Sequence, residues 1–293
     1  MRSGKRGHSS CLPTGAHVTA LGLHYDRRQV QRIGIIASVQ ASKFSVLEVG
    51  IHAVTPASAI QAVRAWVAER TKSYVVFCTV SSVLSFRDDP EVRVAFEEAA
   101  LVTPDGMPLV WLGRLAGFQV ERVYGPDFML DFIAATGGEL RHYFYGGAPG
   151  VAAEMSRRLK ARFPDLIIAG THSPPFGIDP ATPDLSELRL INDAAPDIVW
   201  VGIGHPKQEL WMLHNREHLE APVLAGVGAA FDFHSGTAKE APTWMKRSGL
   251  QWVHRLLTDP RRLWKRYLVG NTRFVLLLPG HLLRSKLGRT KHG

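Results

Sequence analysis

Short apolar runs alternate with amphipathic segments through the middle of the chain. The segment 56–69, for example, places apolar residues at positions 60, 63, 66 and 67, which is the spacing of a helix with one buried face. The expected strands cover 45–54, 74–80, 101–103, 142–145, 166–169, 198–201 and 223–227. The expected helices cover 56–69, 82–99 with a break at Pro90, 106–116, 127–135, 149–163, 185–194 and 206–218.

Strands that alternate with helices in this way indicate parallel strands joined by right-handed helical crossovers. We therefore expect an α/β fold, in which a mainly parallel, Rossmann-like sheet carries helices on both faces. Ligands of such sheets bind beyond the carboxyl ends of the strands, so the loops that follow the strands are where chemistry is expected. These loops are 79–81, 103–106, 146–150, 202–208 and 226–228.

Charge divides the chain into three parts. Residues 1–43 carry seven basic residues and one acidic residue, and residues 44–238 carry 15 basic and 23 acidic residues. Residues 239–293 carry thirteen basic and two acidic residues, with aromatic residues among them. We expect a loosely ordered extension at 1–43, an α/β body at 44–238 and a basic helical appendage at 239–293.

The composition also limits the class of protein. A basic segment with interspersed aromatic residues is typical of contact with an anionic membrane surface, a lipid phosphate or a nucleic acid. Two cysteines are too few for a disulfide scaffold and favour a reducing, cytoplasmic compartment. The sequence has no run of about 18 apolar residues, so we expect no transmembrane helix.

Two strand-end loops carry candidate chemistry. Gly146 and Gly147 let the backbone approach a phosphate at a helix start, although the same loop also fits an ordinary tight turn. Asp105 stands where a general base would lie, although aspartate is equally suited to capping the helix that follows. The G-x-G-x-x-G spacing of a dinucleotide-binding oxidoreductase is absent.

No metal or cofactor is expected. His214, Glu217 and His218 match the H-x-x-E-H pattern of some zinc peptidases, but such pairs are more typical of a solvated helix face. The sequence contains no D-x-D pair to hold a metal on a diphosphate. Arginine, lysine and backbone N–H groups would then have to neutralise a diphosphate, and Arg122, Lys207 and the C-terminal arginines can do so.

Taken together, these loops resemble those of the WecG/TagA/CpsF glycosyltransferases, family 26. The resemblance covers about residues 45–271 and depends on several motifs in a fixed order. The motifs are Thr103-Pro-Asp-Gly-Met-Pro-Leu-Val-Trp111, Glu121-Arg-Val-Tyr-Gly-Pro-Asp127, Tyr145-Gly-Gly-Ala148, Gly202-Ile-Gly-His-Pro-Lys-Gln-Glu209, Gly226-Val-Gly-Ala-Ala-Phe-Asp232, Ala241-Pro242 through Gly249-Leu-Gln-Trp-Val-His-Arg255, and Asp259-Pro-Arg-Arg262.

The resemblance implies a metal-independent, inverting enzyme on the inner face of the plasma membrane. Members of the family move an N-acetylmannosamine-type sugar, or a related hexose or uronic acid, from a UDP-sugar to an undecaprenyl-diphosphate-linked sugar, for polysaccharides of the cell envelope. By resemblance, Asp105 is the candidate base. The candidate substrate-binding residues are Thr79, Arg122, Gly146, Gly147, Lys207, Gln208, Arg255, Arg262 and Lys265.

The sequence departs from the family pattern after the second expected strand. Many members carry Thr-x-Asn there, whereas Thr79-Val80-Ser81 ends in serine, which leaves the donor sugar open. The expected partners are the UDP-sugar, the lipid-linked acceptor, an anionic membrane surface and a possible second copy of the chain, but no nucleic acid. The alternatives are a basic nucleic-acid-binding protein, which an acidic body would oppose, and a non-catalytic nucleotide-binding α/β protein.

Overall fold

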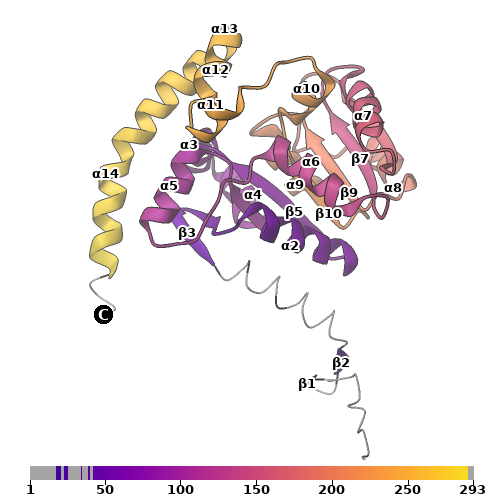
Figure 1. Cartoon of the computed structure of the whole chain (residues 1–293), viewed down its shortest axis with the longest axis horizontal. Coiled ribbons are helices and arrows are strands. Elements are labelled where there is room, and N and C mark those ends of the chain that lie inside the picture. Colours follow the sequence, from indigo (N-terminus) through magenta and orange to yellow (C-terminus); the bar gives the residue numbers. More distant parts are fainter. Residues whose placement is uncertain (1–17, 21–22, 26–33, 35–38, 40–41, 290–293) are drawn as a thin grey trace, which may run out of the picture.

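The computed structural model describes residues 18–20, 23–25, 34, 39 and 42–289, and its centre is a six-stranded sheet (Figure 1). The strands lie in the order β6-β5-β10-β9-β7-β8, and every neighbouring pair is parallel. Their bounds are β5 (Ser73–Cys78), β6 (Leu101–Pro104), β7 (Arg141–Gly146), β8 (Ile167–His172), β9 (Ile198–Gly202) and β10 (Val223–Gly226). The expected α/β fold with a parallel sheet is confirmed.

Helices cover both faces of this sheet because its central strands are apolar on both sides. Tyr74, Val76 and Cys78 of β5 face one apolar cluster, and Val75 and Phe77 face the other. The first cluster packs against α3 (Val80–Asp88), α4 (Pro90–Glu97), α5 (Met107–Leu115), α8 (Leu185–Asp193) and α9 (Lys207–Asn215). The second packs against α2 (Pro56–Ala68), α6 (Gly125–Thr136), α7 (Val151–Arg162) and α10 (Ala230–Ser235).

The prediction of a single strand at 45–54 is wrong. Two antiparallel strands, β3 (Lys43–Val46) and β4 (Val49–His52), occupy the region and form a separate hairpin. Leu47 and Glu48 make its turn at φ values of 48° and 80°. The turn lacks the Asn-Gly or Asp-Gly pair that usually marks a two-residue hairpin, so the pattern predicted one continuous strand.

The C-terminal appendage, residues 239–293, is helical as expected in its described part. It comprises α11 (Thr243–Arg247), α12 (Gln251–Thr258), α13 (Pro260–Trp264), the π-helix η1 (Lys265–Val269) and α14 (Gly270–Arg289). In Figure 1 α14, in yellow, runs along the side of the body that carries α3 and α5. Phe274 is buried there, Arg273 pairs with Asp88 at 2.7 Å, and the His281 ring lies 3.1 Å from the Ser45 carbonyl.

Two further features concern the ends of the chain and the membrane. The expected extension at 1–43 lies largely outside the described residues; within it, β1 (Val18–Ala20) and β2 (Leu23–Tyr25) pair antiparallel. Among the described residues, none of the helices combines the length and the apolar character that crossing a bilayer requires.

Candidate active site

Asp105 lies at the carboxyl end of the edge strand β6, just before α5 begins. Its backbone N–H donates to the Cys78 carbonyl of the neighbouring strand at 2.9 Å, which fixes the loop across two strand ends. Its side chain is 8% exposed, with Oδ1 3.3 Å from the Arg122 guanidinium and Oδ2 accepting from the Gly125 backbone N–H at 3.3 Å. Gly106, rather than Asp105, is the N-cap of α5. The Asp105 carboxylate therefore does not cap α5.

Opposing effects set the pKa of Asp105. Burial raises it, because the charged form loses contact with water, and the negative charge of Asp127 adds to this. The Arg122 charge and the Gly125 N–H favour the charged form and lower the pKa. Burial prevails, so the pKa of Asp105 lies above the usual aspartate value. A carboxylate of raised pKa accepts a proton more readily, which suits a general base.

Arg122 connects Asp105 to the C-terminal appendage. Its Nε donates to the Asp105 carbonyl, and its Nη2 reaches both Asp105 Oδ1 and Gln251 Oε1. Its Nη1 donates to the Lys246 carbonyl at 3.1 Å. The guanidinium lies 4.3 Å from the centre of the Tyr124 ring, within the range of a cation–π contact. Arg122 was expected to bind substrate, but most of its N–H groups already donate hydrogen bonds to other residues of the protein.

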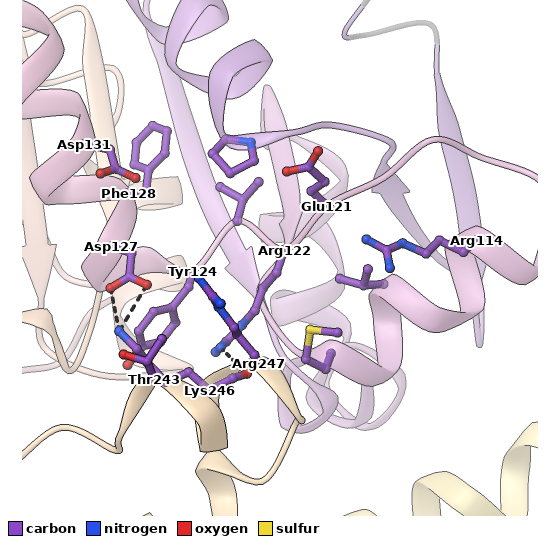
Figure 2. A pocket seen from close by; sticks show the side chains of 14 residues that line it. Arg114, Glu121, Arg122, Tyr124, Asp127, Phe128, Asp131, Thr243, Lys246 and Arg247 are labelled. Atoms are coloured by element: carbon purple, nitrogen blue, oxygen red, sulfur yellow. Dashed lines mark hydrogen bonds and ion pairs between the residues drawn. The ribbon is translucent and has the colours of Figure 1, made fainter.

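A cavity of about 550 Å³ opens beside Arg122 and Tyr124, between α5, α6 and α11 (Figure 2). Two of its lining residues, Lys246 and Asp127, form an ion pair, with Nζ to carboxylate distances of 3.0 and 3.2 Å. Its wall is both apolar and charged. The lining residues are Pro56, Met107, Val110, Arg114, Glu121, Arg122, Val123, Tyr124, Asp127, Phe128, Asp131, Thr243, Lys246 and Arg247. Asp105 is not among them, although its hydrogen-bond partner Arg122 is.

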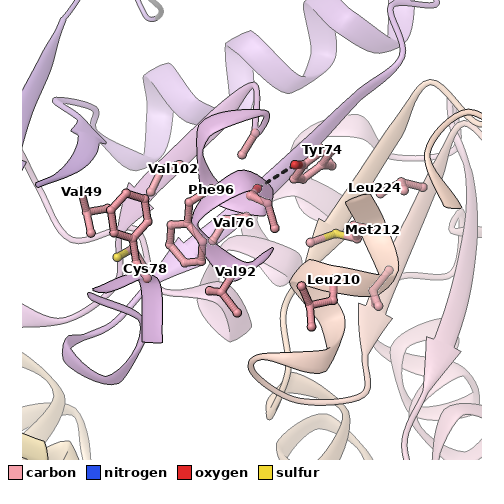
Figure 3. Packing of buried hydrophobic residues seen from close by; sticks show 14 of the residues in the cluster. Val49, Tyr74, Val76, Cys78, Val92, Phe96, Val102, Leu210, Met212 and Leu224 are labelled. Carbon is pink, nitrogen blue, oxygen red and sulfur yellow. Dashed lines mark hydrogen bonds between the residues drawn. The ribbon is translucent and has the colours of Figure 1, made fainter. Parts of the chain in front are cut away.

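The carboxyl end of β5 belongs to a cluster of buried apolar residues. Figure 3 shows Cys78, the last residue of β5, among Val49, Val76 and Val102. Burial raises the pKa of the Cys78 thiol well above its usual value, and the nearby charges of Asp105 and Glu209 act in the same direction. A buried apolar region has a low dielectric constant, which strengthens the electrostatic interactions of the charged groups next to it.

Gln208, on the first turn of α9, is 4% exposed and has a fixed orientation. Its Nε2 donates to the Gly226 carbonyl at 2.6 Å and to Glu209 Oε1 at 3.1 Å. A rotated amide would place its oxygen against these two oxygens, so the orientation follows from the hydrogen-bond partners. Among the described residues Gln208 Oε1 has no hydrogen-bond partner. Gln208 Oε1 is therefore a buried acceptor without a partner, and both hydrogens of the amide are taken.

Glu209, which the sequence analysis did not single out, is a second buried carboxylate at this edge. Its Oε2 lies 3.1 Å from His205 Nδ1, at an angle that does not meet hydrogen-bond geometry. His205 Nε2 lies 2.9 Å from the Ser85 hydroxyl of α3. These contacts connect the start of α9 to α3 and hold Gln208 in place.

Gly146 and Gly147 allow a close approach between two strand ends. Gly146 has φ of 142°, and a Cβ atom on it would lie 2.5 Å from the Gly202 backbone. The Gly147 N–H donates to the Gly202 carbonyl at 3.0 Å. The amide of Gly147 is therefore used inside the protein, and the loop gives a reason for both glycines that requires no ligand.

Thr79 begins α3 as its N-cap. Its Oγ1 accepts from the Ser82 N–H at 3.3 Å and lies 2.9 Å from the Ser81 hydroxyl. From the appendage, Arg266 donates to the same Ser81 hydroxyl through Nε and Nη2, at 3.0 and 2.7 Å. Burial lowers the pKa of Arg266, and Arg255, Glu209 and Asp105 are close enough to influence it. Arg266, which the sequence analysis did not name, thus places a cation of the appendage next to the carboxyl end of β5.

Of the other cations that the sequence analysis named, two are exposed and one packs over an aromatic ring. Lys265 is exposed, with its ammonium 5.6 Å from the centre of the Trp264 ring. Arg255 lies over the Phe233 ring at 5.4 Å. Lys207 is exposed at the first position of α9. Arg262 belongs to α13, and its side chain falls outside the part of the chain that the structure describes.

The structure therefore gathers Asp105, Thr79, Gln208 and Arg122 at the ends of neighbouring strands. It adds Glu209, Gln251 and Arg266. Glu209 and Gln251 stood within quoted motifs, so those motifs were the available signal. Arg266 had no such signal, because it lies outside the quoted motifs.

Known proteins of similar sequence indicate the family of this chain. Residues 44–292 match the Glycosyl transferase WecG/TagA/CpsF family. The chain is 34% identical over 183 residues to the N-acetylglucosaminyldiphosphoundecaprenol N-acetyl-beta-D-mannosaminyltransferase of Bacillus spizizenii, covering 61% of this chain and 68% of that protein. It is 31% identical over 198 residues to the protein of the same name from Bacillus subtilis, covering 66% of this chain and 75% of that protein. The chain belongs to the WecG/TagA/CpsF family of glycosyltransferases, and it is a hexosyltransferase.

Proposed function

We propose that this enzyme transfers an N-acetylmannosamine-type sugar, or a related hexose or uronic acid, from a UDP-sugar to a sugar carried on undecaprenyl diphosphate. Both relatives bear names that describe transfer of N-acetylmannosamine to such an acceptor. The observation that carries the proposal is the buried Asp105 carboxylate, which lies between Arg122 and the Gly125 N–H, while Lys246 and Gln251 of the basic appendage accept hydrogen bonds from Arg122.

In the proposed reaction Asp105 is the general base and the configuration at the anomeric carbon inverts. The acceptor hydroxyl gives its proton to the Asp105 carboxylate while its oxygen forms a bond to the anomeric carbon. The bond from that carbon to the diphosphate oxygen breaks on the opposite face, and UDP leaves with the electron pair. The raised pKa of Asp105 favours this proton transfer.

The departing diphosphate gains negative charge, which cationic groups must balance. Arg266 is the best placed of these groups, since it is half-buried next to the strand ends and bonded only to a neutral hydroxyl in the described hydrogen bonds. Arg255, Arg262, Lys207 and Lys265 can assist if the appendage moves when substrate binds. Neutralisation by these residues is the basis for proposing transfer without a metal.

The appendage also supports a peripheral position on the cytoplasmic face of the membrane. Several large apolar side chains on its helices are exposed, among them those of Leu257, Leu268, Val269, Val275 and Leu276. Basic residues surround them, and each basic residue near an anionic leaflet contributes about 1 kcal/mol of attraction. The lipid-linked acceptor would meet the enzyme at this surface, and a second copy of the chain is another possible partner.

The reaction can be tested with purified protein, a panel of UDP-sugars and a short-chain lipid-diphosphate-GlcNAc, with UDP release as the measurement. We expect release that depends on both substrates and that persists in chelator. Asp105→Asn should lower turnover by roughly 10²–10⁴-fold while the protein still folds. Transfer at the wild-type rate by this variant would remove Asp105 from the role of base. Salt-dependent retention of DNA or RNA in a gel, without sugar transfer, would instead favour a nucleic-acid-binding protein.

A further inference from the structure

We infer that Gln251 is a positioning residue that couples docking of the C-terminal appendage to the alignment of the Asp105 carboxylate. The inference rests on the proposed function, in which Asp105 accepts the proton. It assigns a role to a side chain of α12 that touches neither Asp105 nor, by this geometry, the reacting atoms.

The carboxylate of Asp105 is held by one short segment of the chain. Arg122 binds Oδ1 at 3.3 Å, and the backbone N–H of Gly125 binds Oδ2 at 3.3 Å. Between them lies Tyr124, whose ring supports the Arg122 guanidinium at 4.3 Å. The segment 122–125 is therefore a cradle for the carboxylate, and any group that fixes the cradle also fixes Asp105.

Gln251 contacts this cradle at two points. Its Oε1 accepts from Arg122 Nη2, and its Nε2 donates to the Tyr124 hydroxyl. Because a guanidinium only donates, Gln251 Oε1 must face Arg122, and the Tyr124 hydroxyl then accepts from Nε2. A glutamine fits this position because it carries an acceptor and a donor on one planar group.

The Arg122 guanidinium is nearly saturated by these contacts. It makes four hydrogen bonds to the described residues, two to Asp105 and one each to Lys246 and Gln251. A guanidinium has five N–H groups, so about one is left for a ligand. Two of the four bonds come from the appendage. When the appendage is undocked, Arg122 loses both and is free to leave Asp105.

Ionisation of Asp105 responds to this arrangement. The charged or titratable groups around it are Arg122 and Tyr124 of the cradle, Asp127 of α6, Cys78 of β5, Glu209 of α9, Lys246 of α11 and Arg266 of η1. Arg122 is the cation in direct contact and stabilises the ionised form. If Arg122 moves away, protonated Asp105 becomes favoured, and a higher pH is needed to produce the base.

The test compares Gln251→Leu with wild type and with Gln61→Leu, a matched change at an exposed glutamine of α2. For Gln251→Leu we expect roughly tenfold lower kcat, an acidic limb of the kcat profile moved to higher pH, and little change in KM for the UDP-sugar. Faster amide exchange in 243–258 should accompany these changes. Gln61→Leu should match wild type. An unshifted acidic limb in a folded Gln251→Leu protein would overturn the inference.

Gln251→Glu supplies the second comparison. It retains an acceptor for Arg122, so it should recover most of the turnover that the leucine variant loses. A folded glutamate variant as slow as the leucine variant would contradict the coupling. The titration of Asp105, followed by NMR of its labelled carboxyl carbon, gives a readout that needs no turnover. If wild type transfers no sugar, the proposed function fails, while the Asp105 titration in Gln251→Leu still decides this inference.

Discussion

Arg266 donates two hydrogen bonds to the hydroxyl of Ser81, although 185 residues separate them in the sequence. The contact brings a half-buried cation of the C-terminal appendage to the end of β5, next to the Thr79 that begins α3. Ser81 is also the position at which this chain departs from the Thr-x-Asn pattern of many relatives. The contact joins η1 of the appendage to the first turn of α3.

Arg266→Ala should therefore weaken use of diphosphate-bearing substrates, whereas Lys265→Ala should have a small effect. Arg266 is half-buried near the strand ends, while Lys265 is exposed on the Trp264 ring and screened by solvent. We expect at least a tenfold loss of kcat/KM for the first variant and less than a threefold loss for the second, about 1.4 and 0.7 kcal/mol. Initial rates of UDP release measure both. A larger loss for Lys265→Ala would reverse the assignment.

Asp105→Asn should stabilise the folded protein at neutral pH. The folded-state pKa of Asp105 lies above the unfolded value, so the folded state binds the proton more tightly. Stability from this group is complete below the unfolded pKa, about 4, and is lost as pH rises through the folded pKa. Asparagine carries no charge and avoids this loss.

The measurement for that prediction is Tm as a function of pH for the two proteins. The variant should melt at a higher temperature near pH 7, and the two curves should converge toward pH 4. A gap that stays constant with pH would show that packing, rather than ionisation, separates the proteins.

Gln208→Met should weaken binding of ligands that carry a hexose more than it weakens binding of UDP. The free atom of Gln208 is an acceptor, Oε1, and phosphates at neutral pH offer acceptors, whereas sugar hydroxyls and acetamido N–H groups offer donors. Calorimetry with UDP, a UDP-sugar, a lipid diphosphate and a lipid-diphosphate-GlcNAc separates these cases. Equal losses for UDP and for the lipid diphosphate without a hexose would contradict a contact between Gln208 and the hexose.

Gly146→Ala should destabilise the fold more than Gly150→Ala. Both glycines have positive φ, but a Cβ at Gly146 would lie 2.5 Å from the Gly202 backbone, and a Cβ at Gly150 meets no atom within 4 Å. We expect a loss of more than about 2 kcal/mol for the first and about 1–2 kcal/mol for the second. Urea unfolding measures both. Comparable losses would mean that backbone strain alone explains the first.

The pattern of the sequence by itself determined the α/β class, the parallel sheet and the strand-end position of Asp105. Parallel strands need apolar residues on both faces, and runs such as 74–78 and 198–201 show this directly. The β3–β4 hairpin escaped prediction because no Asn-Gly or Asp-Gly pair marks its turn at Leu47 and Glu48. The family motifs, read in order, indicated which loops carry the site.

Only the tertiary structure decided which side chains meet at those loops. Gln251 and Lys246 bind Arg122 across more than 120 positions of sequence, and no local pattern encodes such a contact. Arg266 rather than Lys265 reaches Ser81, a contact that depends on how η1 packs against the start of α3. The polarity of Gln208 depends on two acceptors, Gly226 and Glu209, that folding places beside it. A periodic pattern specifies which face of an element is buried, whereas hydrogen-bond partners depend on distances that exist only after the elements have packed.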